Sequence, residues 1–591
     1  MKREDIRNIA IIAHVDHGKT TLVDQLFKQS GLFRENQVVD ERIMDSMDLE
    51  RERGITISSK NGSFLYQNKF INIIDTPGHA DFGGQVERVL KMADGTLLLV
   101  DAQEGPMPQT HFVLRKAVEL KLPTIVVINK IDKPDSRAHW VLDQVFDLFV
   151  QLDAPDKILD FPVIYASARD GIAVRNLEDS PESMTPLMDE IIRYIPAPSG
   201  DPDGPLQLQV SSIDYSPYLG RLGIGKITSG VLNINKSIAV ADSRMELSPA
   251  RITKIYRFKG KEKVPVDSAG TGEIVAVAGR DTISVSDTFT DPDNPIPCEP
   301  LAVSPPTISM NFLPNNSPFA GREGRFVTSR HLFERLERET LADVALVVQE
   351  LDTEVGYKVS GRGELHISIL IEKMRREGYE FQVTRPRVIF REENGKRLEP
   401  YEELTIDLPE EFMGPVIKKI GSRKGKMIEM DQREGMSRIM YRIPTRGLFG
   451  FRSEFMSDTK GMGLMNYMFM EYGEYAGDLK SRNFGVLVSQ NTCTTVAYAL
   501  FNLQNRGRLF MGPGVDVYAG QIIGQNSRSD DLTVNPAKSK TLTNSRAAGS
   551  DENIILTPPR DMSLEDCITF ISDDELMEVT PKSIRLRKAS F

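Results

Sequence analysis

The chain has 591 residues, of which 40% are hydrophobic and 27% are charged, and its formal net charge at pH 7 is −11. A length of this kind predicts roughly three to six domains of ordinary globular composition. The acidic balance excludes a protein that coats nucleic acid with its whole surface, although local basic faces are compatible with it.

The sequence also indicates where the protein works. Its three cysteines, Cys298, Cys493 and Cys567, are far apart, which excludes a CxxC zinc site or a disulfide framework and fits a reducing compartment. No apolar run approaches the roughly 18 residues that a membrane span needs. The first expected strand starts so early that no signal peptide is expected before it. We therefore expect a cytoplasmic protein with no membrane partner.

The first motif lies near the N-terminus. An apolar run at 8–13 predicts a buried strand, which leads into the loop AHVDHGKT and a helical pattern. Strand, glycine-bearing loop, Lys-Thr and helix form the P-loop pattern, in which backbone N–H groups surround phosphates. Here Ala13 replaces the usual first glycine. The predicted phosphate-binding residues are Asp16, His17, Gly18, Lys19, Thr20 and Thr21.

A second motif follows the apolar run Phe70–Ile74. Asp75 comes directly after this run and is followed by Thr-Pro-Gly78-His79. A carboxylate at the tip of a strand beside a P-loop is the Walker B arrangement, which holds Mg²⁺. Gly78 would let its N–H group approach the γ-phosphate closely. The alternative is an ordinary turn after a strand, which Pro-Gly also indicates.

Two further motifs indicate which base is bound. The run Thr124–Ile128 ends in Asn129-Lys130-Ile-Asp132, and the run Pro162–Ala166 leads into Ser167-Ala168. A carboxylate can accept from both N1 and the 2-amino group of guanine, a donor pair that adenine lacks. Asp132 therefore predicts guanine specificity. Asn129 is expected to brace the loop, and the side chain of Lys130 is expected to lie over the base. A backbone N–H group near Ser167 and Ala168 is expected to donate to the guanine O6.

The Thr20 hydroxyl is expected to complete the Mg²⁺ shell, because Mg²⁺ needs several hard oxygen ligands. Thr56, in the stretch Arg53-Gly-Ile-Thr-Ile57, is the candidate for a switch that closes on Mg²⁺ and the γ-phosphate and opens after hydrolysis. The alternative is an ordinary strand that starts at Ile55. Helical patterns at 85–92, 109–121 and 140–152 alternate with the strands. This alternation predicts a parallel sheet with helices on both faces and ligands at the carboxyl ends of its strands.

The loop AHVDHGKT, the element RGITI, DTPGH and NKID together resemble the translational GTPases, the group that contains elongation factors Tu and G. The resemblance implies that His79 orients the attacking water once the ribosome repositions it. It also implies that Val15 and Ile55 form an apolar gate and that Asp16 contacts the reaction centre. No arginine in these motifs is a clear arginine finger, so a slow intrinsic hydrolysis of GTP to GDP is expected.

We predict a multidomain α/β and β fold. It comprises a P-loop GTPase domain (1–198), a β-barrel domain (199–303), two ferredoxin-like α+β domains (304–393 and 394–480) and a C-terminal, mostly β domain (481–591). The boundary near 198 follows from a Pro- and Gly-rich linker, and the short strands after it predict the barrel. The two α+β domains resemble the third and fifth domains of elongation factor G. The domain that stands between them in that factor has no counterpart here.

The C-terminal region, including its last strand-like stretch VTPKSIRLRK, resembles the BipA/TypA family, and this resemblance covers essentially the whole chain. The family is associated with stress adaptation and large-subunit assembly. A LepA-like or translocase-like elongation factor is the alternative, and an assembly factor that uses GTP only as a binding switch is another. The expected partners are the ribosome, through rRNA and ribosomal proteins, and a bound tRNA. A stress nucleotide such as ppGpp would fit the guanine pocket, and the protein is expected to be a monomer.

Two basic segments are candidates for RNA contacts. The first lies in the second α+β domain, and the second is a long loop without periodicity in the C-terminal domain, which in the family reaches toward a bound tRNA. A solvated helix face and a mobile surface loop are the respective alternatives. The predicted RNA-binding residues are Lys418, Lys419, Arg423, Lys424, Lys538, Lys540 and Arg546.

Overall fold

The computed structural model describes residues 2–14, 16–31, 48–53, 56, 59–77, 83–216, 218–280, 282–301, 305–433, 435–479, 482, 484–538 and 555–591. The chain forms two compact units: Met1–Ser304 with Leu341–Val344, and Pro305–Thr340 with Ala345–Phe591. Within the described residues, no helix is both long enough and apolar enough to cross a membrane.

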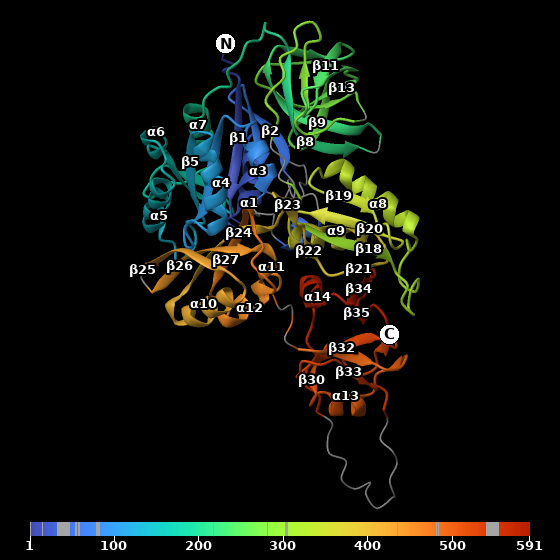
Figure 1. Ribbon diagram of the computed structural model, residues 1–591. Helices are drawn as coiled ribbons and strands as arrows, with labels where there is room; N and C mark the ends of the chain where they lie inside the picture. Colours follow the sequence, from blue (N-terminus) through green and yellow to red (C-terminus); the bar gives the residue numbers. More distant parts are fainter. Residues whose placement is uncertain are drawn as a thin grey trace, which may run out of the picture. The chain divides into compact units, whose positions relative to one another are not determined.

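A seven-stranded sheet organises the N-terminal part of the first unit (Figure 1). The predicted strands and helices are present here. Five neighbouring strands are parallel, but the edge strands β2 and β7 run antiparallel to their neighbours, which the prediction of a parallel sheet did not include. In sheet order the strands are β2 (Lys60–Tyr66), β3 (Lys69–Asp75), β1 (Ile6–Ala13), β4 (Gly95–Asp101), β5 (Thr124–Asn129), β6 (Val163–Ser167) and β7 (Ile172–Val174).

Helices cover both faces of this sheet because the side chains of each buried strand alternate between the two faces. On β1, Ile9 and Ile11 pack with α1 and α7, whereas Ala10 and Ile12 pack with α3, α4 and α5. The helices of this domain are α1 (Lys19–Gln29), α2 (Asp48–Arg53), α3 (Gly83–Leu90), α4 (Pro108–Glu119), α5 (Ala138–Gln151), α6 (Asp156–Leu159) and α7 (Thr185–Tyr194).

The predicted β-barrel is an eight-stranded antiparallel sheet, and most of its strands contribute apolar side chains to one common core. A short pair, β10 (Val231–Asn233) and β15 (Ser268–Gly270), lies beside it. In sheet order the eight strands are β12 (Leu247–Arg251), β11 (Ser237–Ala241), β17 (Thr288–Thr290), β8 (Gln207–Ser216), β9 (Gly220–Ser229), β16 (Ile274–Ala278), β13 (Lys254–Lys259) and β14 (Glu262–Val266).

In the second unit, one sheet of eleven strands joins the first α+β region to the C-terminal region. The β-α-β-β-α-β order of the ferredoxin type runs from β18 through α8 (Ser329–Ala342) and α9 (Glu364–Arg376) to β21. The sheet order is β19 (Val347–Glu350), β20 (Tyr357–Gly361), β18 (Ile308–Pro314), β21 (Phe381–Val383), β34 (Glu575–Val579), β35 (Ile584–Lys588), β32 (Gln521–Asn526), β28 (Val486–Ser489) and β33 (Leu532–Val534), with β22 (Arg387–Val388) on β18 and β30 (Gly507–Leu509) on β32.

The second α+β region of this unit repeats the ferredoxin order around a five-stranded sheet. The C-terminal region adds helices α13 (Ala497–Leu503) and α14 (Leu564–Phe570) and the short pair β29 (Cys493–Thr494) and β31 (Asp516–Val517). The second α+β region contains β23 (Arg391–Glu393), β24 (Lys396–Pro409), α10 (Met413–Ser422), β25 (Lys426–Arg433), β26 (Met436–Pro444), α11 (Thr445–Leu448), α12 (Phe451–Asp458) and β27 (Leu464–Glu474).

Candidate guanine nucleotide site

The loop between β1 and α1 requires a glycine at position 18. Gly18 precedes α1 with φ 93°, in the left-handed region. A Cβ atom at this position would lie 2.5 Å from Nδ2 of Asn129. The predicted phosphate loop and the predicted base-binding loop are therefore in close contact, and only a residue without a side chain fits between them.

Lys19 is the centre of the predicted phosphate and metal region. Its ammonium group lies 2.6 Å from Oδ1 of Asp75, donates to the carbonyl of Thr76 at 2.9 Å, and contacts the hydroxyl of Thr56. Asp75 and Thr56 are both buried. Three sequence-distant segments thus bring a carboxylate and a hydroxyl to one cation. Hard oxygens of this kind fit Mg²⁺. Thr20 and Thr21 follow Lys19 in the first turn of α1.

Asn129 connects three of the predicted loops at the other end of the site. Its side-chain amide donates from Nδ2 to the carbonyl of His17 at 2.8 Å, and its Oδ1 accepts from the N–H group of Ala168 at 2.9 Å. The side chain is almost completely buried. Asn129 thus links the loop that contains His17 to the loop that contains Ala168. Nearby, Asp132 lies 3.1 Å from a guanidinium nitrogen of Arg169, and the hydroxyl of Ser167 donates to Asp170 at 2.7 Å.

Asp101 ends β4 at the same edge of the sheet and is not among the site residues expected from the sequence. Its buried carboxylate lies 2.8 Å from the ammonium of Lys130 and 3.0 Å from that of Lys133. Burial by itself would raise the pKa of Asp101, but hydrogen bonds from Lys130, the N–H group of Gln103 and Lys133 lower it to about 2. The position at the end of an apolar run, TLLLVD, is a signal that could have identified this residue.

Two histidines of the phosphate loop lie close together. The rings of His14 and His17 are 5.2 Å apart in an edge-on arrangement, and His17 is fully buried. Nε2 of His17 lies 3.5 Å from a carboxylate oxygen of Glu104. Burial lowers the pKa of His14 to about 4, and the neighbouring His17 contributes to this shift. His14 is therefore uncharged at neutral pH.

The predicted RNA-binding residues differ in their surroundings. Lys418, Lys424 and Lys538 are exposed. Lys419 pairs with Asp458 at 2.7 Å, and Arg423 pairs with Glu454 at 2.9 Å and donates to two backbone carbonyls. Six of the predicted site residues lie outside the described residues: Val15, Ile55, Gly78, His79, Lys540 and Arg546.

Four family models match the chain one after another. They are the elongation factor Tu GTP binding domain at 4–197, elongation factor Tu domain 2 at 220–290, the elongation factor G C-terminus at 396–483 and the TypA/BipA C-terminal domain at 484–591. The last match disfavours the LepA-like alternative. The fold is also similar to that in a crystal structure of a Thermus thermophilus protein, with a TM-score of 0.55 and 16% identity. The match covers 80% of this chain and 98% of the Thermus chain. It shows a shared fold.

Relatives of similar length match almost the whole chain. A protein of Salmonella typhimurium is 53% identical over 99% of this chain and 97% of its own length. A protein of Escherichia coli K12 is 52% identical over the same shares, and one of Synechocystis is 50% identical over 99% of this chain and 98% of its own length. Each of the three is named large ribosomal subunit assembly factor BipA. With its GTP-binding domain and its TypA/BipA C-terminal domain, this chain belongs to the BipA/TypA family of GTP-hydrolysing translational GTPases.

Proposed function

We propose that the protein binds the ribosome in its GTP form, hydrolyses GTP when the ribosome activates it, and acts in assembly of the large ribosomal subunit. The convergence of Asp75 and Thr56 on the Lys19 ammonium carries the GTPase part of the proposal. The assembly role rests on relatives at 50–53% identity that are named large ribosomal subunit assembly factors. We propose the domain boundaries given above for this machinery.

We propose specific roles for the nucleotide-binding residues. Lys19 neutralises the β- and γ-phosphates, and the N–H groups of the loop at 16–21 and of Gly78 surround them. Asp132 selects guanine, while Lys130, Ser167 and Ala168 complete the base site. Thr20, Thr56 and Asp75 would hold Mg²⁺, which supplies charge neutralisation for the phosphates when bound.

For the hydrolytic step, we propose that His79 orients the attacking water with the help of Asp16. Val15 and Ile55 keep His79 away from the water until the ribosome repositions it. Because phosphoryl transfer depends on positioning and charge stabilisation, the loss of one positioning side chain should reduce the rate strongly without removing GTP binding.

GTP hydrolysis measured with and without purified bacterial ribosomes tests this step. We expect strong stimulation of the wild type, and a stimulated rate for His79→Ala that is lower by on the order of a hundredfold. The binding-defective variant Lys19→Ala separates this loss from a loss of nucleotide binding. Equal rates for the wild type with and without ribosomes would refute ribosomal activation.

The assembly role is tested in cells that lack the gene. Sedimentation of ribosomal particles should show incomplete large subunits, and the wild-type gene should restore complete ones. Lys19→Ala should fail to restore them, whereas Lys116→Ala, a change on the outer part of α4, should succeed. Normal large subunits without the gene, together with slowed movement of translating ribosomes, would favour a translocase-like role instead.

We propose finer partner assignments from the sequence. The loop from Lys538 onward, with Lys540 and Arg546, contacts RNA and a bound tRNA, and Lys418, Lys419, Arg423 and Lys424 contact rRNA phosphates. Replacing Lys538, Lys540 and Arg546 together with Ala should weaken ribosome binding and leave basal hydrolysis intact. Unchanged ribosome binding and assembly would contradict the loop assignment. We further propose that the protein is a cytoplasmic monomer and that ppGpp competes for the guanine site.

A further inference from the structure

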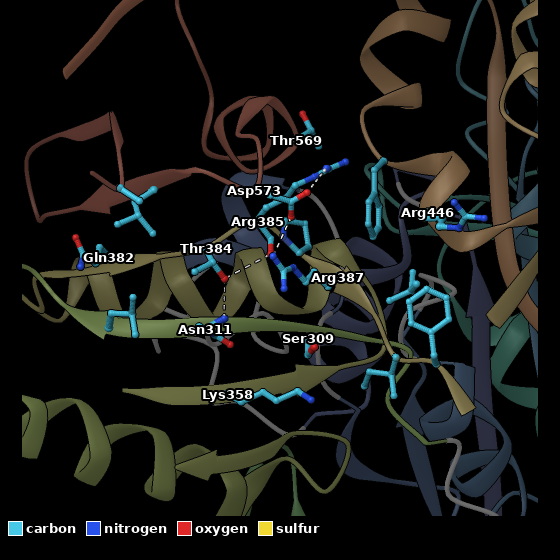
Figure 2. A pocket seen from close by; sticks show the side chains of 18 of the residues that line it. Ser309, Asn311, Lys358, Gln382, Thr384, Arg385, Arg387, Arg446, Thr569 and Asp573 are labelled. Atoms are coloured by element: carbon cyan, nitrogen blue, oxygen red, sulfur yellow. Dashed lines mark hydrogen bonds and ion pairs between the residues drawn. The ribbon is translucent and has the colours of Figure 1, made fainter. Parts of the chain in front are cut away.

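The second unit contains a cavity that the GTPase cycle does not use. Its volume is about 1060 Å³, and its walls come from the eleven-stranded sheet, the second α+β region and the segments around α14 and β35 (Figure 2). Cavities that bind small molecules are commonly about 300–1,000 Å³, so this one is large enough for a ligand of nucleotide size.

The sheet presents a polar face to this cavity. Along β18, Ile308, Met310 and Phe312 pack in the core, whereas Ser309 and Asn311 line the cavity. Strand register extends this face across the sheet, because directly opposed residues in antiparallel strands point to the same side. Asn311 lies opposite Lys358, Leu313 opposite Gln382, and Leu576 opposite Arg587. Figure 2 shows Lys358, Asn311 and Gln382 on this side of the sheet.

The lining has a strong excess of positive charge, with seven Lys and Arg side chains and two acidic ones. Asp573 is shared between Arg385 at 3.6 Å and Arg387 at 3.1 Å. Arg423 and Arg446 are held by Glu454 and Glu399, which do not line the cavity. Burial lowers the pKa of Arg385, and the nearby Arg387 and Arg482 add to this effect.

Three cations of the lining, Lys358, Arg397 and Arg587, have no acidic partner among the residues that the structure describes. Arg587 is only 9% exposed, and its guanidinium donates to Oε1 of Gln382 at 2.7 Å and to the side-chain carbonyl of Asn316. Both acceptors are neutral, and Nε of Arg587 has no hydrogen-bond partner in the described structure. A buried charge is costly unless an opposite charge compensates it.

Arg397, in β24, is held in place by two aromatic rings. Its guanidinium lies 3.6 Å from the centre of the Phe390 ring and 4.9 Å from that of Tyr475. Stacking of this kind fixes the plane of an arginine and leaves its N–H groups available for an anion. The cavity thus has one buried and one stacked guanidinium together with the Lys358 ammonium, and no carboxylate of the described residues neutralises them.

We propose that this cavity binds a small molecule that carries several phosphate groups. Guanidinium groups match phosphate oxygens through paired N–H donors, and several cations around one space favour a multiply charged anion over a single carboxylate. The depth of the cationic groups favours a small ligand over a nucleic acid helix, because the Arg446 side chain is only 13% exposed and Arg587 is buried. The site is separate from the guanine nucleotide site, since all its lining residues lie in the second unit.

The test is calorimetric titration of the full chain with tripolyphosphate, after GDP has saturated the guanine site. The variant Lys358→Glu/Arg397→Glu reverses two lining charges, and Arg508→Glu/Arg528→Glu reverses two exposed charges of the same unit that do not line the cavity. We expect the wild type and the second variant to bind equally. The first variant should bind at least about tenfold more weakly, because it loses charge-assisted hydrogen bonds to the phosphate groups.

Two readouts make the result decisive. An unchanged limited-proteolysis pattern of the second unit in the Lys358→Glu/Arg397→Glu variant would show that this unit is folded. Unchanged GDP binding and basal GTP hydrolysis separate this inference from the proposed GTPase cycle. Equal tripolyphosphate affinity in all three proteins would overturn the proposal. So would a short oligouridylate that binds with the same dependence on Lys358 and Arg397 while tripolyphosphate does not bind, because the cavity would then be an RNA contact.

Discussion

The ammonium of Lys130 lies 2.8 Å from Oδ2 of Asp101, a carboxylate that ends β4 and has no solvent exposure. The same oxygen lies 3.0 Å from the ammonium of Lys133. A single buried acid therefore positions two lysines in the loop that follows β5. One of them, Lys130, is the residue proposed to lie over the guanine base, so the base site depends on a residue that does not touch the base.

Replacing Asp101 with Asn should weaken binding of GDP by about tenfold, because charge-assisted hydrogen bonds to both lysines are lost. Titration with a fluorescent GDP analogue measures this. Asp143→Asn, an exposed change on α5, should leave the affinity unchanged. If Asp101→Asn bound GDP as the wild type does, the loop after β5 would not need this anchor.

Replacing Gly18 with Ala should impair nucleotide binding through a clash with the Asn129 side chain. The added Cβ would meet Nδ2 at 2.5 Å and disturb its hydrogen bond to His17, in addition to roughly 1 kcal/mol for a left-handed alanine. Gly31→Ala is a matched control, because Gly31 has φ 76° and no atom within 4 Å of the added Cβ. Both variants should lose some thermal stability, but only Gly18→Ala should lose GDP affinity. A parallel loss of affinity in both would assign the effect to backbone strain.

The half-buried His14 should make stability depend on pH. Its pKa in the folded protein is about 4, below the ordinary value of 6.5, so the unfolded chain binds more protons in this range. Its contribution is complete above pH 6.5 and is lost as the pH falls towards 4, by about 1.4 kcal/mol per pH unit. The difference in unfolding free energy between wild type and His14→Gln, measured from about pH 7 to pH 5, should change by this slope. A constant difference for His14→Gln would mean that folding does not shift the pKa of His14.

The nucleotide domain could be predicted well because the phosphate loop, the Walker B motif and the two base motifs each follow a buried apolar strand. The anchoring of Lys130 by Asp101 could not, since a carboxylate at the end of a strand has many roles and only the fold shows its partners. In the second α+β region, β24 spans Lys396–Pro409, but only its second half shows the apolar alternation of Leu404, Ile406 and Leu408. Its first half buries Glu399, which is held by Arg446, and periodicity does not identify a buried ion pair.

The strand order of the eleven-stranded sheet could not be predicted from the sequence, for a different reason. The strand-like stretch VTPKSIRLRK predicts a final strand, and β35 confirms it. Its neighbours depend on contacts between distant segments: β34 pairs with β21, and β35 pairs with β32. No local pattern encodes pairing across such a separation. The grouping of cations around the cavity results from the same long-range pairing, because this sheet brings the Arg587 guanidinium within hydrogen-bond distance of Gln382.

The position of β35 in the interior of this sheet leads to a prediction about the end of the chain. Removing 584–591 would delete a strand that pairs with β34 on one side and β32 on the other, and would leave the buried Glu578 without Arg585. We expect early unfolding and proteolysis of the second unit, while the first unit still binds GDP. Removing only Ser590 and the exposed Phe591 should have little effect, because both lie beyond β35. Limited proteolysis with mass spectrometry distinguishes the two truncations. If the longer truncation resisted protease as the intact chain does, β35 would be dispensable for the stability of the second unit.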